Sequence, residues 1–265
     1  MSTAITGAQT IAAAFATSGK RAALMPYLMG GFPDMAGSRA IGEAYAEAGA
    51  DLVELGVPFS DPLADGPVIH AAGTRALAAG ATLHDVLEVG RALAESVPVV
   101  LMCYANLVLA RGPERFADEL AQRGVSGLIV PDLPLEEAEG TLAACDDAGL
   151  ALVPLVAPTT PPGRLAAIGA RARGFVYTVS VTGTTGERGS LAQDLPDILA
   201  RTKAATDVPV ALGFGIGTHE AAAAAADAGA DGVIVGSRLV RAAAESERPA
   251  DAVRELVAGF AAALR

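Results

Sequence analysis

Two acidic residues in the stretch "ELGVPFSDPLADGP", residues 54–67, are placed where they could move or stabilise charge. Glu54 stands inside an apolar run, and Asp65 follows in a loop stiffened by three prolines. A carboxyl group buried at a strand end has a raised pKa and can give and take a proton near neutral pH, whereas a better solvated one stays ionised. The pair therefore predicts chemistry in which Glu54 shuttles a proton and Asp65 stabilises positive charge.

Structural explanations compete with this one. A buried ion pair could account for Glu54, and Asp61 and Asp65 could be turn or helix-capping residues. We interpret Asp61 as such a turn residue. The strand-end position favours a functional role for Glu54, and Asp65 remains a candidate beside it.

Eight short apolar runs could position these acids. They are apolar throughout rather than alternating, which is typical of strands covered on both faces. The runs span residues 22–29, 51–55, 97–104, 127–130, 151–156, 174–179, 208–212 and 232–235. Helical patterns lie between them, for example over residues 38–48, 113–123, 135–148 and 219–228. Several of these helices end at a glycine, as a left-handed cap residue would, just before the next run. The glycines are Gly49, Gly124, Gly149 and Gly229.

Eight strand–helix units in 265 residues favour a closed (β/α)₈ TIM barrel, an α/β fold, over an open doubly wound sheet. No G-x-G-x-x-G follows the first run, which weakens the dinucleotide-binding alternative. We expect residues 1–265 to form one domain with a short N-terminal helix and an extra helix after strand 2, within residues 61–81. A barrel carries its site at the carboxyl ends of the strands, where Glu54, Tyr104 and Tyr177 are expected.

Glycine-rich turns follow the last two strands. Gly213 and Gly215 belong to "GFGIG", and Gly236-Ser237 opens a short helix. Free backbone N–H groups at such positions bind phosphate without a lysine, and barrels commonly build a phosphate site there. Each motif alone could be a simple tight turn, but the two on adjacent strands favour an anion site. A third glycine loop, residues 182–189, could lie across the same anion.

The composition limits the partners. The net charge of −11 argues against nucleic acid and anionic membrane, and no apolar run is long enough to span a bilayer. Cys103 and Cys145 form neither a metal-binding spacing nor a disulfide framework. We therefore expect a cytoplasmic protein without a metal, and we expect no signal peptide.

The strand-2 stretch "ELGVPFSDPLADGPVI" resembles the signature of the tryptophan synthase alpha subunit family. Other stretches agree with the family in order along nearly the whole chain. They are "MPYLMGGFPD", "LMCYANLV", "VPDLPLEE", "LVAPTTP", "YTVSVTGTTG", "GFGIG" and "IVGSRLV". The strand-2 motif is highly specific, whereas the glycine loops are shared with many barrels.

The resemblance implies a lyase that cleaves indole-3-glycerol phosphate to indole and glyceraldehyde 3-phosphate by a retro-aldol step. Glu54 matches the family's general acid and base, and Asp65 matches the carboxylate that accepts the indole N–H. The positions that match substrate contacts are Tyr27, Tyr104, Tyr177, Thr185 and Phe214. Those that match phosphate contacts are Gly186, Gly215, Gly236 and Ser237.

The resemblance further implies an α₂β₂ heterotetramer with a pyridoxal-phosphate-dependent beta subunit, and no cofactor or metal in this chain. Residues 104–106 match a loop that faces that partner. Met29, His70 and Gly73 depart from the family pattern. A lyase that needs no partner, a catalytically silent regulatory subunit and a sugar-phosphate isomerase remain as alternatives.

Overall fold

The computed structural model describes residues 5–179, 195–213 and 215–265 of the chain. Within these residues nine parallel strands form one sheet in the order β5-β4-β3-β2-β1-β9-β8-β7-β6. The strands are β1 (Ala23–Met29), β2 (Val53–Gly56), β3 (Val99–Met102), β4 (Gly127–Ile129), β5 (Ala151–Val153), β6 (Leu155–Val156), β7 (Val176–Val179), β8 (Val210–Gly213) and β9 (Gly232–Val235). The eight predicted strands are therefore present, and the fold is the predicted (β/α)₈ barrel.

The fifth predicted strand is interrupted, which the sequence analysis did not anticipate. Pro154 divides it into β5, which pairs with β4, and β6, which pairs with β7. Proline has no N–H to donate to a neighbouring strand, but its carbonyl oxygen accepts a hydrogen bond of 2.9 Å from the Tyr177 N–H. The chain therefore continues the barrel wall from β5 through Pro154 to β6, although the regular pairing of strands is interrupted at Pro154.

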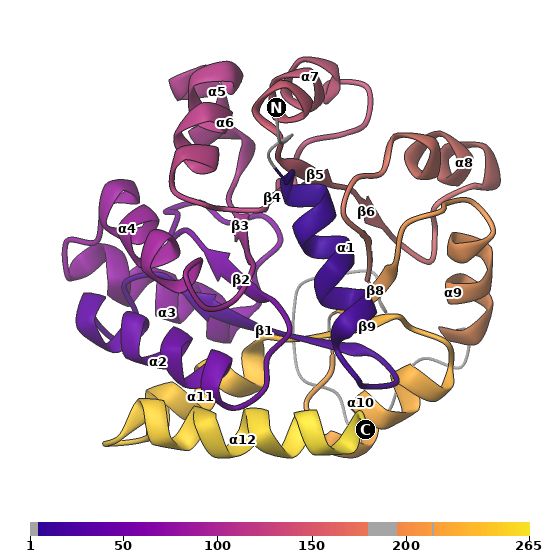
Figure 1. The fold of residues 1–265 in the computed structure, drawn as a ribbon. Coiled ribbons are helices and arrows are strands. Elements are labelled where there is room, and N and C mark those ends of the chain that lie inside the picture. Colours follow the sequence, from indigo (N-terminus) through magenta and orange to yellow (C-terminus); the bar gives the residue numbers. More distant parts are fainter. Residues whose placement is uncertain (1–4, 180–194, 214) are drawn as a thin grey trace.

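Helices surround the barrel (Figure 1). They are α1 (Gly7–Thr17), α2 (Met35–Glu47), α3 (Pro67–Ala78), α4 (Leu83–Leu93), α5 (Ala105–Arg111), α6 (Pro113–Gln122), α7 (Glu139–Ala148), α8 (Pro162–Arg171), α9 (Leu195–Lys203), α10 (His219–Asp227), α11 (Ser237–Glu245) and α12 (Pro249–Ala263). The extra helix expected after strand 2 is α3. The helix predicted to begin at residue 135 begins later, because hydrogen-bonded turns at Glu137 and Ala138 precede α7.

Glycines with positive φ end the helices that precede strands, as predicted. Gly49, Gly124, Gly149 and Gly229 have φ angles between 75° and 101°. A side chain at such a φ would be strained, whereas glycine adopts it freely. These caps stop each helix within a few residues of the strand that follows, so they set where each strand enters the barrel.

The barrel interior is closed at one end by α1, which lies across the opening in Figure 1. Ile11 is fully buried and packs with Phe15 against the inward side chains of the strands, including Phe175 and Ala151. The rings of Phe15 and Phe175 are 5.7 Å apart. We call this end the floor and the opposite end, where the strands have their carboxyl termini, the mouth.

In the part of the chain that the structure describes, no helix combines the length and the apolar character that crossing a bilayer requires.

Candidate active site

Glu54 projects from β2 into the mouth of the barrel. Its neighbours Val53 and Leu55 pack in the outer core between strands and helices, so the alternation of a strand turns Glu54 inward. The side chain is 1% exposed, and its Oε2 has no hydrogen-bond partner. Burial, and secondarily the charge of Asp65, raise the pKa of Glu54 to about 8.

The ion-pair explanation for Glu54 is not supported within the described residues, where no salt bridge reaches it. A carboxyl group in this setting is protonated near neutral pH and titrates close to it. Such a group can donate a proton and later take one back, which is the role that the sequence predicts.

Asp65 is held at the same end by a tyrosine from the next strand. Tyr104 lies at the start of α5, and its hydroxyl donates to Asp65 Oδ1 over 3.0 Å. The Ala64 N–H donates to the same hydroxyl, also at 3.0 Å. The Phe59 ring stacks on Tyr104 at 5.1 Å. These contacts fix the loop between β2 and α3, and the sequence offered no signal for them because they join residues 39 to 45 positions apart.

The environment of Asp65 differs from that of Glu54. Partial burial raises the pKa of Asp65, whereas the Tyr104 hydrogen bond and the charge of His70 lower it. A carboxylate that accepts a hydrogen bond and is half-buried keeps its charge more easily than a fully buried one. The two acids therefore lie in the different surroundings that paired catalytic carboxyl groups need.

Two tyrosines fill the mouth beside Glu54. Tyr27 on β1 is paired in register with Glu54, and Tyr177 on β7 lies close enough for the charge of Glu54 to raise its pKa. Each hydroxyl occupies the space that a side chain would take at a glycine of another strand. A Cβ added at Gly56 would lie 2.0 Å from the Tyr27 hydroxyl oxygen, and one added at Gly213 would lie 2.3 Å from the Tyr177 hydroxyl oxygen. Glycines on the adjacent strands thus admit both rings.

The residues proposed to bind phosphate follow adjacent strands. Gly215 has a φ of 90° after β8, and Gly236 is the N-cap of α11 after β9. Ser237 is the first residue of α11, whose first turn carries no acidic side chain. The site is contiguous with the acids, because a Cβ at Gly236 would lie 3.6 Å from the Cβ of Tyr27. Thr185, Gly186 and Phe214 lie outside the described residues.

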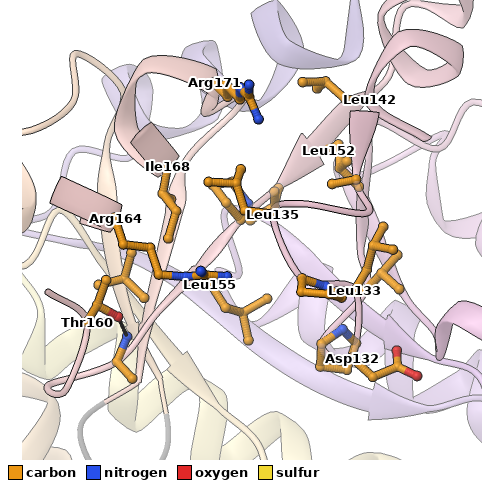
Figure 2. A pocket seen from close by; sticks show the side chains of 18 of the residues that line it. Asp132, Leu133, Leu135, Leu142, Leu152, Leu155, Thr160, Arg164, Ile168 and Arg171 are labelled. Carbon is orange, nitrogen blue, oxygen red and sulfur yellow. Dashed lines mark hydrogen bonds between the residues drawn. The ribbon is translucent and has the colours of Figure 1, made fainter. Parts of the chain in front are cut away.

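A metal site and a second pocket are the other features that could carry function. Among the described residues, no cluster of three or more metal-ligating side chains is found. A crevice of about 530 Å³ lies between α7 and α8, beside the break at Pro154. Figure 2 shows that Leu135, Leu142, Leu152 and Ile168 line its upper part. Arg164 at its rim is bound by Glu136 through two hydrogen bonds of 2.5 and 2.8 Å, so the crevice lacks the acid–base character of the mouth.

The fold and the site define a class of protein. The chain is a (β/α)₈ barrel in which two carboxyl groups meet at the end where such barrels carry their active sites. Comparison with known proteins narrows this class, since the family model for the tryptophan synthase alpha chain matches residues 14–263. The chain therefore belongs to the tryptophan synthase alpha chain family.

Individual relatives agree with this assignment. The tryptophan synthase alpha chain of Synechococcus sp. (strain CC9902) is 51% identical over 223 residues, which is 83% of each chain. That of Methanosarcina mazei is 47% identical over 245 residues, 91% of this chain and 90% of the relative. A structure of Mycobacterium tuberculosis tryptophan synthase superimposes with a TM-score of 0.90 at 41% identity, covering 96% of this chain and 98% of the other.

A structure titled for the tryptophan synthase a2b2 complex of Pyrococcus furiosus is similar as well. It has a TM-score of 0.85 and 36% identity, and it covers 91% of this chain and 98% of that chain.

Proposed function

We propose that this chain cleaves indole-3-glycerol phosphate to indole and glyceraldehyde 3-phosphate by a retro-aldol step, as the alpha subunit of tryptophan synthase in the last steps of L-tryptophan biosynthesis. The observation that carries the proposal is the buried Glu54 carboxyl group, whose Oε2 has no hydrogen-bond partner, at the same end of the barrel as the hydrogen-bonded Asp65. Family membership over residues 14–263 supplies the substrate.

The two acids divide the reaction. Glu54, protonated near neutral pH, gives its proton to the indole ring carbon that bears the glycerol chain and accepts a proton from the hydroxyl on the adjacent carbon. The bond between these two carbons then breaks, which leaves indole and an aldehyde. Asp65, held by Tyr104, accepts a hydrogen bond from the indole N–H. Its charge stabilises the positive charge that develops on the ring.

The remaining site residues orient the substrate. We propose that Tyr27, Tyr104 and Tyr177 line the indole end together with Phe214 and Thr185. The phosphate is bound by backbone N–H groups at Gly186, Gly215, Gly236 and Ser237. The short helix α11 opens at Gly236, and the free N–H groups of its first turn favour an anion.

This chain needs no cofactor or metal of its own in the proposal, and pyridoxal phosphate belongs to the beta subunit. We propose an α₂β₂ assembly, like the tryptophan synthase a2b2 complex of Pyrococcus furiosus. Two exposed leucines support a partner at the mouth: Leu63 in the loop after β2 is 76% exposed and Leu109 in α5 is 62% exposed. Both leucines belong to segments that follow strands at the mouth, where a partner could cover them.

Two further assignments accompany this function. We propose that residues 1–265 form a single domain, in which α1 and α3 are added to the eight strand–helix units. We also propose a cytoplasmic location, because Cys103 and Cys145 are both free and free thiols are the usual state in reducing compartments.

The test is indole release by the purified chain with indole-3-glycerol phosphate. Glu54→Gln removes the titrating group and keeps its size, so kcat should fall by about 10²–10⁴-fold while circular dichroism stays unchanged. Asp65→Asn should lose most activity because it removes the charge. Asp61→Asn is the matched control, since Asp61 is an exposed acid of the same loop and should keep near wild-type turnover.

Two results would decide the alternatives. A Glu54→Gln variant with wild-type turnover would exclude the proposed mechanism. Stimulation of indole release by an added beta subunit would separate the heterotetramer from a lyase that acts alone.

A further inference from the structure

The hydroxyl of Tyr27 is a buried polar group without a strong partner. Tyr27 is 7% exposed, and the hydrogen bond found for its hydroxyl goes to the Met29 Sδ at 3.9 Å. A thioether sulfur is a weak acceptor. A buried donor that lacks a good acceptor is costly, so this hydroxyl gains free energy whenever a better acceptor comes within reach.

The position of this hydroxyl places it beside Glu54. It occupies the space of the missing side chain at Gly56, since an added Cβ there would lie 2.0 Å away. Residues 54 and 56 of a strand point to the same face, so the hydroxyl lies one step from Glu54 toward the mouth. Burial, and after it the charges of Asp65 and Glu54, raise the pKa of Tyr27, so the phenol stays protonated and remains a donor.

The thioether lies against α3. A Cβ added at Gly73 in that helix would lie 3.4 Å from the Met29 methyl group and 3.8 Å from its sulfur, which is ordinary van der Waals contact. Met29 and Gly73 are two of the departures from the family pattern, and they are neighbours here. The Met29 side chain therefore packs against α3 beside Gly73, with its sulfur 3.9 Å from the Tyr27 hydroxyl.

Glu54 requires a donor once it has given up its proton. The titratable groups that face it are Asp65 from the loop after β2, Tyr27 from β1 and Tyr177 from β7. Its neighbour on β3 is the apolar Val100. An ionised Asp65 repels the Glu54 carboxylate, so ionised Glu54 must be stabilised by the tyrosine hydroxyls. The Tyr27 hydroxyl donates to a weak acceptor, the Met29 sulfur.

We propose that Tyr27 is a positioning residue that acts through Glu54. Its hydroxyl leaves the Met29 thioether and donates a hydrogen bond to the Glu54 carboxylate in the half of the reaction in which Glu54 is ionised. The bond stabilises the charged form and holds the oxygen that must take up the substrate proton. This inference rests on the proposed function, in which Glu54 shuttles the proton.

The test compares Tyr27→Phe with wild type in two measurements. The first is the titration of Glu54 in the substrate-free protein, followed by NMR of side-chain ¹³C-labelled glutamate and assigned by the signal that Glu54→Gln removes. Loss of the hydroxyl should raise the Glu54 pKa by about one unit, as expected for a hydrogen bond to a charged group. The second is the pH profile of kcat, whose Glu54 limb should shift in the same direction while KM changes less than about twofold.

Tyr45→Phe is the matched control. Tyr45 is also buried, at 1% exposure, and its hydroxyl donates to the Tyr27 carbonyl oxygen at 3.1 Å, on the side of β1 that faces α2. This variant should lower Tm without moving the Glu54 titration. Met29→Leu keeps the apolar packing but removes the competing acceptor, so it should lower the Glu54 pKa, and a raised pKa in this variant would contradict the exchange of partners.

The outcomes separate the two proposals. An unchanged Glu54 titration in Tyr27→Phe, or an equal shift in Tyr45→Phe, overturns the role of Tyr27. Wild-type indole release by Glu54→Gln overturns the proposed function instead, and the titration, which needs no substrate, identifies which of the two has failed.

Discussion

The floor and the mouth of the barrel are built by the same device and serve different purposes. At both ends a glycine on a strand makes room for a large side chain that comes from elsewhere. At the floor the admitted side chains are apolar and belong to α1, whereas at the mouth they are tyrosines of neighbouring strands. The floor glycines are Gly127, Gly174 and Gly232, which contact Ile11 or Phe15, and the mouth glycines are Gly56 and Gly213, which contact Tyr27 and Tyr177.

This difference shows how one barrel separates stability from chemistry. The floor excludes water with side chains that have no polar atoms, so burial contributes stability there without leaving any donor unsatisfied. The mouth also buries its aromatic rings, but these carry hydroxyl groups next to a buried acid. Burial of polar groups is costly there, and it produces the shifted pKa of Glu54 on which the proposed chemistry depends.

The largest effect is expected from emptying the floor. Ile11→Ala leaves a cavity under the strands, because the Ile11 Cδ1 lies 3.0–3.1 Å from Cβ positions built at Gly127 and Gly174. The free energy of unfolding should fall by about 2–5 kcal/mol, while kcat for indole release stays within about twofold of wild type. Urea unfolding and a steady-state assay measure both. A large loss of kcat at unchanged KM would show that floor and mouth are coupled.

A smaller effect is expected from the mouth acid, and it depends on pH. The pKa of Glu54 is about 8 in the folded chain against an ordinary value of 4.5, so the folded state binds more protons between these values. The free energy of unfolding contributed by Glu54 therefore falls as pH rises through this window, by at most about 1.4 kcal/mol per pH unit. Glu54→Gln removes this titration.

Unfolding of wild type and Glu54→Gln at about pH 5, 6.5 and 8 measures it. The stability of the variant relative to wild type should increase at each step and level off above pH 8. A difference that is the same at all three values would mean that burial does not raise this pKa.

The smallest effect is expected at the cap of the floor helix. Thr6 and Gln9 form a capping box at the start of α1, with the Thr6 N–H donating to Gln9 over 2.9 Å. Thr6→Ala should cost about 1 kcal/mol. Thr82→Ala removes the equivalent box of α4 and should cost about the same. If Thr6→Ala leaves Tm unchanged while Thr82→Ala lowers it, α1 opens separately from the rest of the barrel.

Much of the fold was predictable because its signals are local. The apolar runs, the glycines that end the helices and the strand-end position of Glu54 all depend on neighbouring residues in the sequence. The break at Pro154 was missed because Pro154 lies within a continuous apolar run whose composition outweighed one proline. The start of α7 was placed too early because Leu135 continues the apolar period of the helix through what is a series of turns.

The candidate site was predictable as a set of residues but not as a geometry. The type and position of Glu54 and Asp65 indicate their chemistry, whereas the Tyr104–Asp65 hydrogen bond joins the segments that follow β2 and β3 and cannot be read from a linear pattern. The contact of the Tyr27 hydroxyl with Gly56 has the same character. The register of β1 against β2 is set by packing of the entire barrel, which no short motif records.

The interruption at Pro154 makes the barrel a rolled sheet with a seam rather than a uniform cylinder. The two edges, β5 and β6, meet at a residue that donates no hydrogen bond, and the covering helices α7 and α8 leave a crevice at the same place. A rolled sheet can change its circumference slightly at a seam, whereas a fully laddered wall resists this everywhere. Any widening of the mouth to admit a ligand would therefore be concentrated along this line, opposite the rigid β1–β2 wall that carries the proton shuttle.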